Sequence, residues 1–172
     1  MAIRDLVAAD MGAALALNNA AAPAVNELTV DDLAWLQSFA VHTLVAEADD
    51  GSFAGFCLTL GPGVPYDSLN YRWFSDHAAT LGYDGFAYLD RVAVGAAARR
   101  SGVGRALYRH VVDALYGTAP VLFCEVNVRP RNDASLAFHA ALGFREVGQH
   151  DTDGGKRVSL LALDLDRRAP TN

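Results

Sequence analysis

Alternating apolar and polar residues open the chain and predict a first strand over Ala2–Val7. An alanine- and leucine-rich segment follows, and it predicts a helix that begins at an Asp10 cap and runs to about Ala21. Thr29 begins a second predicted helix, because two carboxylates stand in its first turn and apolar residues continue at helical spacing. The amino-terminal part is therefore predicted as a strand followed by two helices.

Two apolar runs of β character come next, at His42–Ala48 and Phe53–Leu60. The residues between them include Gly51, and glycine accepts the positive φ that a tight hairpin turn requires. The pattern then dissolves over residues 61–83, where turn formers mix with aromatic residues and a short helix is expected near Ser75–Leu81. This part predicts an antiparallel hairpin followed by a long connection.

The second half of the chain shows a strand–helix–strand pattern. Its predicted elements are a strand at Phe86–Val94, a helix at Gly102–Tyr116, a strand at Val121–Val128 and a helix capped by Asp133 that runs through Leu142 to a left-handed Gly143. Phe144–Gly148 then leads through the hairpin turn at Thr152–Gly155 into a last strand at Arg157–Leu165. Hairpin signals lie on both sides of a central strand–helix–strand unit. The prediction is an α/β chain of the α+β type, with a mixed, mostly antiparallel sheet of about six to seven strands, one parallel pair and helices on both faces.

Length, composition and charge limit the class of protein. At 172 residues, 52% hydrophobic and 20% charged, the chain is predicted to form a single domain over residues 1–172, with a disordered tail at 166–172. Its net charge of -6 argues against a nucleic-acid partner, and no apolar run approaches the ~18 residues that would span a membrane. Cys57 and Cys124 lie in apolar runs without zinc-binding spacing, which predicts reduced core thiols, no metal and a cytoplasmic location.

One segment departs from this acidic background. Five arginines and no carboxylate lie between Arg91 and Val112, and the stretch AARRSGVGRAL contains Arg99, Gly102 and Gly104 at the start of a predicted helix. Outward backbone N–H groups, glycines and a helix N-terminus are what a phosphate-binding turn needs. The P-loop pattern is excluded because no glycine is followed by Lys and a hydroxyl residue, and the dinucleotide pattern because its third glycine position holds Leu107.

The pattern that does match is [RQ]xxGxG, placed after the strand LDRVAV and before a helix. It resembles the pyrophosphate loop of the GNAT N-acetyltransferase superfamily, and the later segment NDASLAFHAALGF resembles the late motif of that family. The resemblance implies the GNAT fold, with the parallel strand pair splayed around coenzyme A, and acetyl-CoA as cofactor. It also implies direct transfer of the acetyl group to a primary amine of a small molecule or a peptide.

The resemblance further implies roles for individual residues. Backbone groups of Val92, Ala93 and Val94 would pair with the pantetheine arm, and amides from Arg100 to Arg105 would hold the pyrophosphate. The full set of implied cofactor-binding residues is Val92, Ala93, Val94, Arg99, Arg100, Ser101, Gly102, Val103, Gly104, Arg105, Asn132, Ser135 and Phe138.

Acetyl transfer to an amine needs a base, and a group that protonates the leaving thiolate. Glu125, in the apolar run FCEVNV, matches the base position of the family's ribosomal-protein N-terminal acetyltransferases, although a carboxylate there could also face solvent or pair with an arginine such as Arg91. Asp90 is an alternative base. His139 stands where much of the family has a tyrosine, so it could act as the acid, hydrogen-bond the cofactor in its neutral form, or be structural.

The aromatic residues of the 61–83 connection are candidates for the acceptor site. Tyr66, Tyr71 and Trp73 could enclose an ammonium or an aromatic acceptor, or could form a satellite core under a long loop. Exposed aromatic residues there would also allow a homodimer. Two other functions stay open at this stage: a non-catalytic acyl-CoA-binding module, and a transferase for a longer acyl group.

Overall fold

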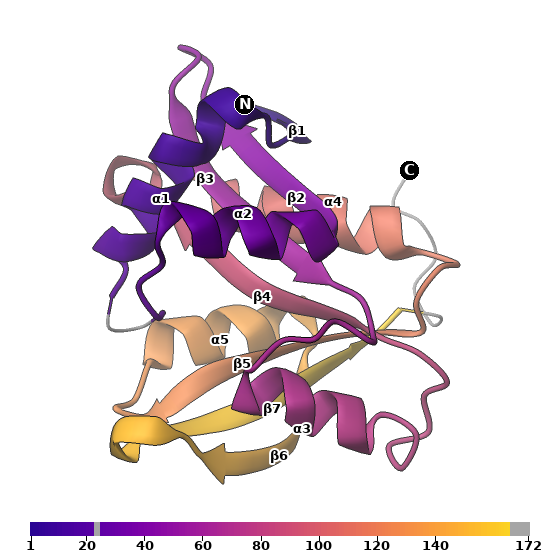
Figure 1. Cartoon of the computed structure of the whole chain (residues 1–172). Helices are drawn as coiled ribbons and strands as arrows, with labels where there is room; N and C mark the ends of the chain where they lie inside the picture. Colours follow the sequence, from indigo (N-terminus) through magenta and orange to yellow (C-terminus); the bar gives the residue numbers. More distant parts are fainter. Residues whose placement is uncertain (23–24, 166–172) are drawn as a thin grey trace. The chain divides into compact units, whose positions relative to one another are not determined.

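The structure, a computed structural model, describes residues 1–22 and 25–165 of the chain (Figure 1). It divides the chain into two compact units, each made of two segments. Unit 1 comprises Met1–Gly61 and Leu89–Ala114, and unit 2 comprises Pro62–Tyr88 and the chain from Leu115 onward. The tail predicted at residues 166–172 lies outside the described residues.

Unit 1 contains the amino-terminal strands and helices and the central helix. Its elements are β1 (Ala2–Asp5), α1 (Met11–Ala20), α2 (Val30–Phe39), β2 (Ala40–Glu47), β3 (Phe53–Leu60), the later part of β4 (Ala87–Val94), the 3-10 turn η2 (Ala96–Ala98) and most of α4 (Val103–Leu115). β1 pairs antiparallel with β2, and β2 with β3. Seven successive residues of β3 are buried, so this strand is covered on both faces. Within this unit α1 and α2 lie in front of β2 and β3 and α4 lies behind them (Figure 1).

Unit 2 contains the remaining strands and helices. Its elements are α3 (Leu69–His77), the start of β4, β5 (Val121–Arg129), α5 (Asp133–Leu142), β6 (Arg145–Asp151) and β7 (Arg157–Asp164). β7 pairs antiparallel with both β5 and β6. Among the described residues, a parallel pairing joins β4 to β5, with Ala87 level with Leu122 and Tyr88 level with Phe123. α3 packs on this unit through an aromatic core, in which the ring of Phe74 stacks on Phe123 at 4.4 Å.

The sheet has seven strands in the order β1-β2-β3-β4-β5-β7-β6. It is mostly antiparallel with one parallel pair, as the hydrophobic pattern and the hairpin signals predict. Gly51 and Gly143 have φ values of 81° and 91°, so both adopt the left-handed conformation that the sequence predicts for them. No helix in the described ranges is long and apolar enough to cross a membrane.

The helix expected near Ser75–Leu81 was placed wrongly, because it begins and ends earlier. α3 begins after Ser68, whose hydroxyl accepts a hydrogen bond from the Tyr71 backbone N–H at 3.3 Å and so caps the helix. Ser75 lies inside the helix instead and donates to the Tyr71 carbonyl. The helix ends at His77, before a turn in which Gly82 has a φ of 92°.

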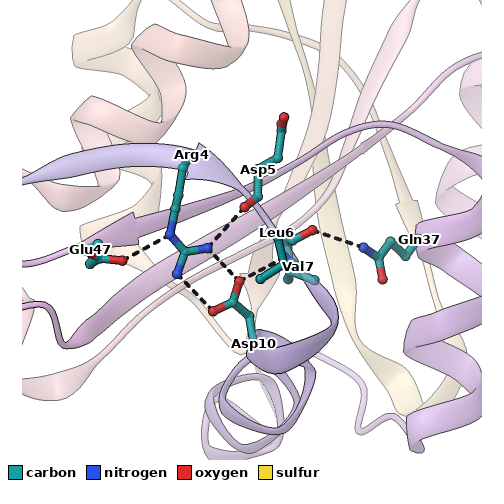
Figure 2. A network of polar contacts seen from close by, with 7 residues as sticks. All are labelled: Arg4, Asp5, Leu6, Val7, Asp10, Gln37 and Glu47. Carbon is teal, nitrogen blue, oxygen red and sulfur yellow. Dashed lines mark hydrogen bonds and ion pairs between the residues drawn. The ribbon is translucent and has the colours of Figure 1, made fainter.

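Two predicted helix caps also differ from the structure. Asp10 precedes α1, but its carboxylate accepts hydrogen bonds from the Val7 N–H and from the guanidinium of Arg4 rather than from a helix amide (Figure 2). Asp133 is the first residue of α5, and the cap is Asn132, whose side-chain oxygen accepts from the Ser135 N–H at 3.1 Å. At α5 the better-placed Asn132 thus satisfies the amide donor, whereas no side-chain cap bond is formed by Asp10 at α1.

Candidate functional site

The predicted phosphate turn connects β4 to α4 in unit 1. Arg99 is extended, Arg100 has a φ of 65°, and Gly102 has a φ of 93°. The left-handed conformation costs glycine little but is uncommon for arginine, so Arg100 is held there by its surroundings. Ser101 fixes the turn, because its hydroxyl donates to the Ala98 carbonyl at 2.6 Å. The chain thereby reverses direction over a few residues.

The turn leads directly into the first turn of α4. Gly102 precedes the helix and has no side-chain oxygen, so it cannot cap the first amides as serine or aspartate would. The N–H groups of Val103, Gly104 and Arg105 have no acceptor within the helix by its geometry. These amides and the positive end of the helix dipole attract an anion, and exposed arginine side chains stand on both sides of them.

Along β4, the strand before this turn, the backbone N–H and C=O groups point alternately to the two edges of the strand. The Gly95 N–H donates to the Ala54 carbonyl on β3 at 2.9 Å, and the Ala93 carbonyl also points at β3. Backbone groups of successive strand residues point to opposite edges. The N–H and C=O groups of Val92 and Val94 therefore point away from β3, in the direction that a ligand adding along this edge would need.

Gly55 on β3 sets the distance between this strand and the turn. A Cβ at this position would lie 2.8 Å from the Ala93 carbonyl oxygen and 3.1 Å from Cγ1 of Val103. The first contact is shorter than real Cβ atoms show and the second is tighter than most of them, so glycine at this position lets β4 and the first residue of α4 come this close.

Glu125 lies half-buried on β5 in unit 2, as its apolar run predicts. The hydroxyl of Tyr88 donates a hydrogen bond to Oε2 of Glu125 at 2.8 Å. Because side chains alternate along a strand, Glu125 points to the same face as Phe123, which is the face that α3 covers. Tyr88 is missing from the predicted site residues, although a tyrosine inside an apolar strand signals a buried hydroxyl that needs a partner.

Three of the predicted residues come together at the start of α5. Asn132 caps the helix through the Ser135 N–H, and Nδ1 of His139 lies 2.7 Å from the Ser135 carbonyl. A carbonyl can only accept, so Nδ1 carries the proton and Nε2 of the neutral ring carries the lone pair. The rings of Phe138 and Phe144 meet the imidazole edge to face at 5.4 and 5.2 Å.

The burial of His139 bears on the acid role. The side chain is buried, and desolvation lowers the pKa of His139 below its ordinary value even though the bond to the Ser135 carbonyl acts to raise it. The imidazole is therefore neutral at pH 7. Of the roles open from the sequence, this geometry favours the neutral hydrogen-bonding role over the imidazolium acid.

The aromatic residues of the long connection form packing contacts around α3. Tyr71 is buried and its hydroxyl accepts from the Val64 N–H, while Tyr66 lies against it at 5.8 Å. Trp73 stacks on the His77 ring at 4.2 Å and covers Gly148, where a Cβ would come within 2.9 Å of the indole. Contact of Tyr66, Tyr71 or Trp73 with an acceptor stays a prediction.

Asp90, the alternative base, lies in a buried polar cluster of unit 1. Nε of Arg91 is 3.1 Å from Oδ2 of Asp90, an ion pair without hydrogen-bond geometry, and both side chains are buried. Nη1 of Arg91 donates to Oδ1 of Asn18 and to the Asn26 carbonyl at 3.0 and 3.1 Å. The guanidinium thereby ties β4 to the end of α1 and to the segment before α2. Neither Arg91 nor Asn18 belongs to the site residues that the sequence suggests.

The described ranges contain no cluster of possible metal ligands and no exposed thiol. Within residues 1–22 and 25–165, no three His, Cys, Asp or Glu side chains gather as a metal site would require. Burial raises the pKa of the Cys57 thiol to about 12 and also raises that of Cys124. Both thiols are buried, as the sequence predicts.

Comparisons with known proteins agree with this arrangement. A sequence model described as "Acetyltransferase (GNAT) family" matches residues 13–144 of the chain. A search of curated proteins finds no significant match.

Solved structures with the same fold are numerous, and three illustrate the likeness. The ribosomal-protein-S18-alanine N-acetyltransferase of Escherichia coli has a TM-score of 0.71 at 22% identity, over 99% of this chain and 97% of that chain. The ribosomal-protein-alanine N-acetyltransferase of Brucella melitensis has a TM-score of 0.69 at 25% identity, over 95% and 99%. The protein yncA of Salmonella typhimurium, solved with its cofactor acetyl-CoA, has a TM-score of 0.70 at 23% identity, over 100% and 98%.

Proposed function

The chain belongs to the GNAT family of acetyltransferases, and from this premise we propose that it transfers the acetyl group of acetyl-CoA directly to a primary amine within a ternary complex. The observation that carries the proposal is the turn between β4 and α4, where a glycine without capping atoms precedes a helix flanked by exposed arginines. A similar structure that contains acetyl-CoA supports this choice of donor.

In this proposal the donor is held chiefly by backbone groups. The amides from Arg100 to Arg105 bind the pyrophosphate at the helix N-terminus, and the side chains of Arg99 and Arg100 add charge-assisted contacts. The outward backbone groups of Val92 and Val94 pair with the pantetheine arm as an added strand would. Asn132, Ser135 and Phe138 are proposed neighbours of the pantetheine arm and the thioester.

The reaction needs the amine in its neutral form. We assign proton removal from the ammonium to the carboxylate of Glu125, after which the nitrogen lone pair attacks the thioester carbon. The new N–C bond forms and the C–S bond breaks with its electron pair leaving on the thiolate. The attacking nitrogen loses a second proton as it becomes an amide, and the thiolate takes up one proton in exchange. The net change is RNH₃⁺ plus acetyl-CoA to N-acetylated amine plus CoA-SH plus H⁺. Neutral His139 serves as a hydrogen-bonding group beside the cofactor, through its Nε2 side.

The acceptor class is the open part of the proposal. Two similar structures are N-acetyltransferases of ribosomal-protein alanine, which supports an amine acceptor and makes peptide N-termini candidates beside small amines. The test mixes pure protein and acetyl-CoA, or a longer acyl-CoA in a parallel series, with polyamines, amino acids, aminoglycosides and peptide N-termini and follows thiol release. Acceptor-dependent thiol supports the transferase. Tight CoA binding without such thiol from any acceptor favours the binding module, and release only from longer acyl-CoA favours the other alternative.

A charge variant tests the donor site separately. Gly104→Glu places bulk and negative charge in the first turn of α4, so it should abolish CoA binding and leave the fold intact. His110→Glu is the matched control, because it adds one negative charge to the exposed side of the same helix beyond that turn. Isothermal titration with CoA distinguishes the two variants. Retained affinity in Gly104→Glu would contradict the assignment of this turn.

We also propose that the protein works in the cytoplasm. Its two cysteines are buried and unpaired with each other, which fits a reducing compartment.

A further inference from the structure

The buried hydroxyl of Tyr88 in unit 2 has no role in the chemistry proposed so far. Only 1% of Tyr88 is exposed, and its hydroxyl donates to Oε2 of Glu125 at 2.8 Å. The phenol ring packs against two rings of α3, Tyr71 at 5.5 Å and Phe74 at 5.7 Å. Such packing fixes the ring plane and therefore the position of the hydroxyl.

The register of β4 and β5 explains why this phenol reaches this carboxylate. Tyr88 stands level with Phe123 in the parallel pairing, and Glu125 lies two residues further on the same face of β5. A long side chain reaches such a diagonal neighbour. Tyr88 and Phe123 are the last paired residues of this parallel ladder in the described chain, so the contact lies where the ladder ends.

We propose that Tyr88 is a positioning residue for acetyl transfer, whose hydroxyl holds Oε2 of Glu125 so that Oε1 receives the proton of the acceptor ammonium. The inference rests on the proposed function of Glu125 as the base. Tyr88 keeps its own proton: one N–H bond of the ammonium breaks, an O–H bond forms at Oε1, and the nitrogen retains the electron pair. The phenol thus acts through the carboxylate and not on the substrate.

The surroundings of Glu125 make this donor effective. On β7 the residue opposite Glu125 is apolar Leu160. Titratable side chains near Glu125 include Tyr88 on β4, which donates to it, and the neighbouring Cys124, while Tyr71 on α3 packs on Tyr88. Donation to a carboxylate favours its charged form, the form that a base needs. Loss of the phenol hydroxyl should therefore move the protonation of the base to higher pH.

Tyr88→Phe tests the inference because it removes one oxygen and keeps the packed ring. We expect kcat/KM for the amine to fall by about tenfold near pH 7, as one hydrogen bond to a charged group implies. We also expect the acidic limb of the kcat/KM profile to move to higher pH, while KM for acetyl-CoA is unchanged. A merely structural tyrosine would lower stability without moving that limb.

Tyr83→Phe is the matched control in the same unit. Tyr83 also donates to a carboxylate, that of Asp164, and its ring also packs against Phe123. Asp164 pairs with Val121, four residues before Glu125 on β5 and so about 13 Å away along the strand. Tyr83→Phe should leave the acidic limb in place. An equal shift in both variants would overturn the inference.

A double-mutant cycle separates the inference from the proposed function. If Tyr88 acts through Glu125, Tyr88→Phe has no further effect on kcat once Glu125→Gln has removed the base. Additive losses, or an unchanged acidic limb in Tyr88→Phe, would overturn the inference while leaving the base assignment standing. Full activity of Glu125→Gln would instead refute the base assignment itself.

Carboxyl titration gives a reading that needs no turnover. The chain has four glutamates, so ¹³C labelling of glutamate and the spectrum of Glu125→Gln identify the Glu125 signal. Its midpoint should be lower in the wild type than in Tyr88→Phe. Equal midpoints would show that the Tyr88 hydroxyl does not stabilise the charged Glu125 carboxylate, and this result does not depend on knowing the acceptor amine.

Discussion

At the scale of single residues, Gly55 determines how closely β4 approaches β3. Gly55→Ala would place a Cβ 2.8 Å from the Ala93 carbonyl oxygen, which is backbone and cannot rotate away. We expect a loss of about 1–3 kcal/mol in the free energy of unfolding, the usual result of overpacking. CoA affinity should fall as well, because the shifted strand carries Val92 and Val94. Urea unfolding and isothermal titration measure the two effects.

Gly12 provides the opposite case for the same substitution. It lies inside α1, and a Cβ there would meet nothing within 4 Å. Gly12→Ala should therefore stabilise the protein by about 0.5–1 kcal/mol, because alanine loses less backbone entropy in a helix. If both variants shifted stability in the same direction, the close approach at Gly55 would not be the cause.

The backbone conformation of a single residue was predictable where one residue type is clearly preferred for it. Gly51 and Gly143 were predicted in the left-handed conformation and are found there. The positive φ of Arg100 could not be predicted, because nothing in its side chain favours that conformation and the tight reversal imposes it. The cap of α5 was assigned one residue late, since Asn132 and Asp133 are both good caps and only the path of the backbone selects between them.

At the scale of elements, the Arg91 cluster, formed by Arg91, Asp90, Asn18 and the Asn26 carbonyl, ties the end of α1 and Asn26 to β4. Arg91→Met should lower the free energy of unfolding by about 3–5 kcal/mol, because it leaves the buried Asp90 carboxylate without this guanidinium. Amide exchange should also accelerate at Leu28, because its N–H donates to Oδ1 of Asn19, which also accepts a hydrogen bond from Asn18. Urea unfolding and hydrogen exchange measure these effects.

An exposed ion pair is the control for this cluster. Arg72 lies 3.1 Å from Asp67, but both side chains are mostly exposed. Arg72→Met should change stability by less than about 1 kcal/mol, since water competes for both charges. A similar loss in the two variants would mean that burial is not what makes Arg91 important.

A second network ties β1 to its neighbours and should give stability a dependence on pH. Arg4 forms two hydrogen bonds to Asp10 and one to Glu47, and Asp10 accepts the Val7 N–H (Figure 2). The bonds from Arg4 hold the pKa of Asp10 below its ordinary value of 3.8. A carboxyl with a lowered folded pKa stabilises the protein above its unfolded pKa, and this contribution is lost as the pH falls through the folded pKa.

Asp10→Asn tests this contribution. The variant should unfold at a lower urea concentration than the wild type at pH 7, and the gap should shrink as the pH falls below about 4. Chemical denaturation at pH 7 and pH 3 measures it. A gap of equal size at both values would show that the loss in the variant does not come from the ionised carboxylate.

Elements with strong periodicity or clear turn residues were predicted close to their observed bounds. The β4–α4–β5 sequence is the best example, because apolar runs and the glycine turn mark each end. α3 was misplaced because its cap, Ser68, lies in a segment full of turn formers, and because its aromatic residues are held by packing on β5 and β6 rather than by helical periodicity.

At the scale of the whole molecule, a mostly antiparallel sheet with one parallel pair was predictable, because local hairpins and one strand–helix–strand unit leave few ways to pair the strands. Partners of individual buried polar groups were not. Tyr88 meets Glu125, and Arg91 meets Asn18 and Asn26, through contacts between residues 37 to 73 positions apart. Sequence patterns carry little information on such long-range side-chain pairs.

The net charge of -6 opposes the binding of an anionic cofactor, whereas the arginine turn favours it. Charges beyond about 10 Å are largely screened at 0.1 M salt, so the nearby arginines should dominate. CoA affinity should therefore fall as NaCl rises from 0.1 to 0.5 M.

Arg100→Asn should flatten this dependence on salt, because asparagine removes the charge and still tolerates the φ of 65°. Titration calorimetry at several salt concentrations measures the slope, with Arg109→Asn on the exposed side of α4 as control. If the wild-type affinity rose with salt, the distant acidic charge would outweigh the turn. The pyrophosphate would then depend on the helix amides alone, and Arg100→Asn would bind as tightly as the wild type.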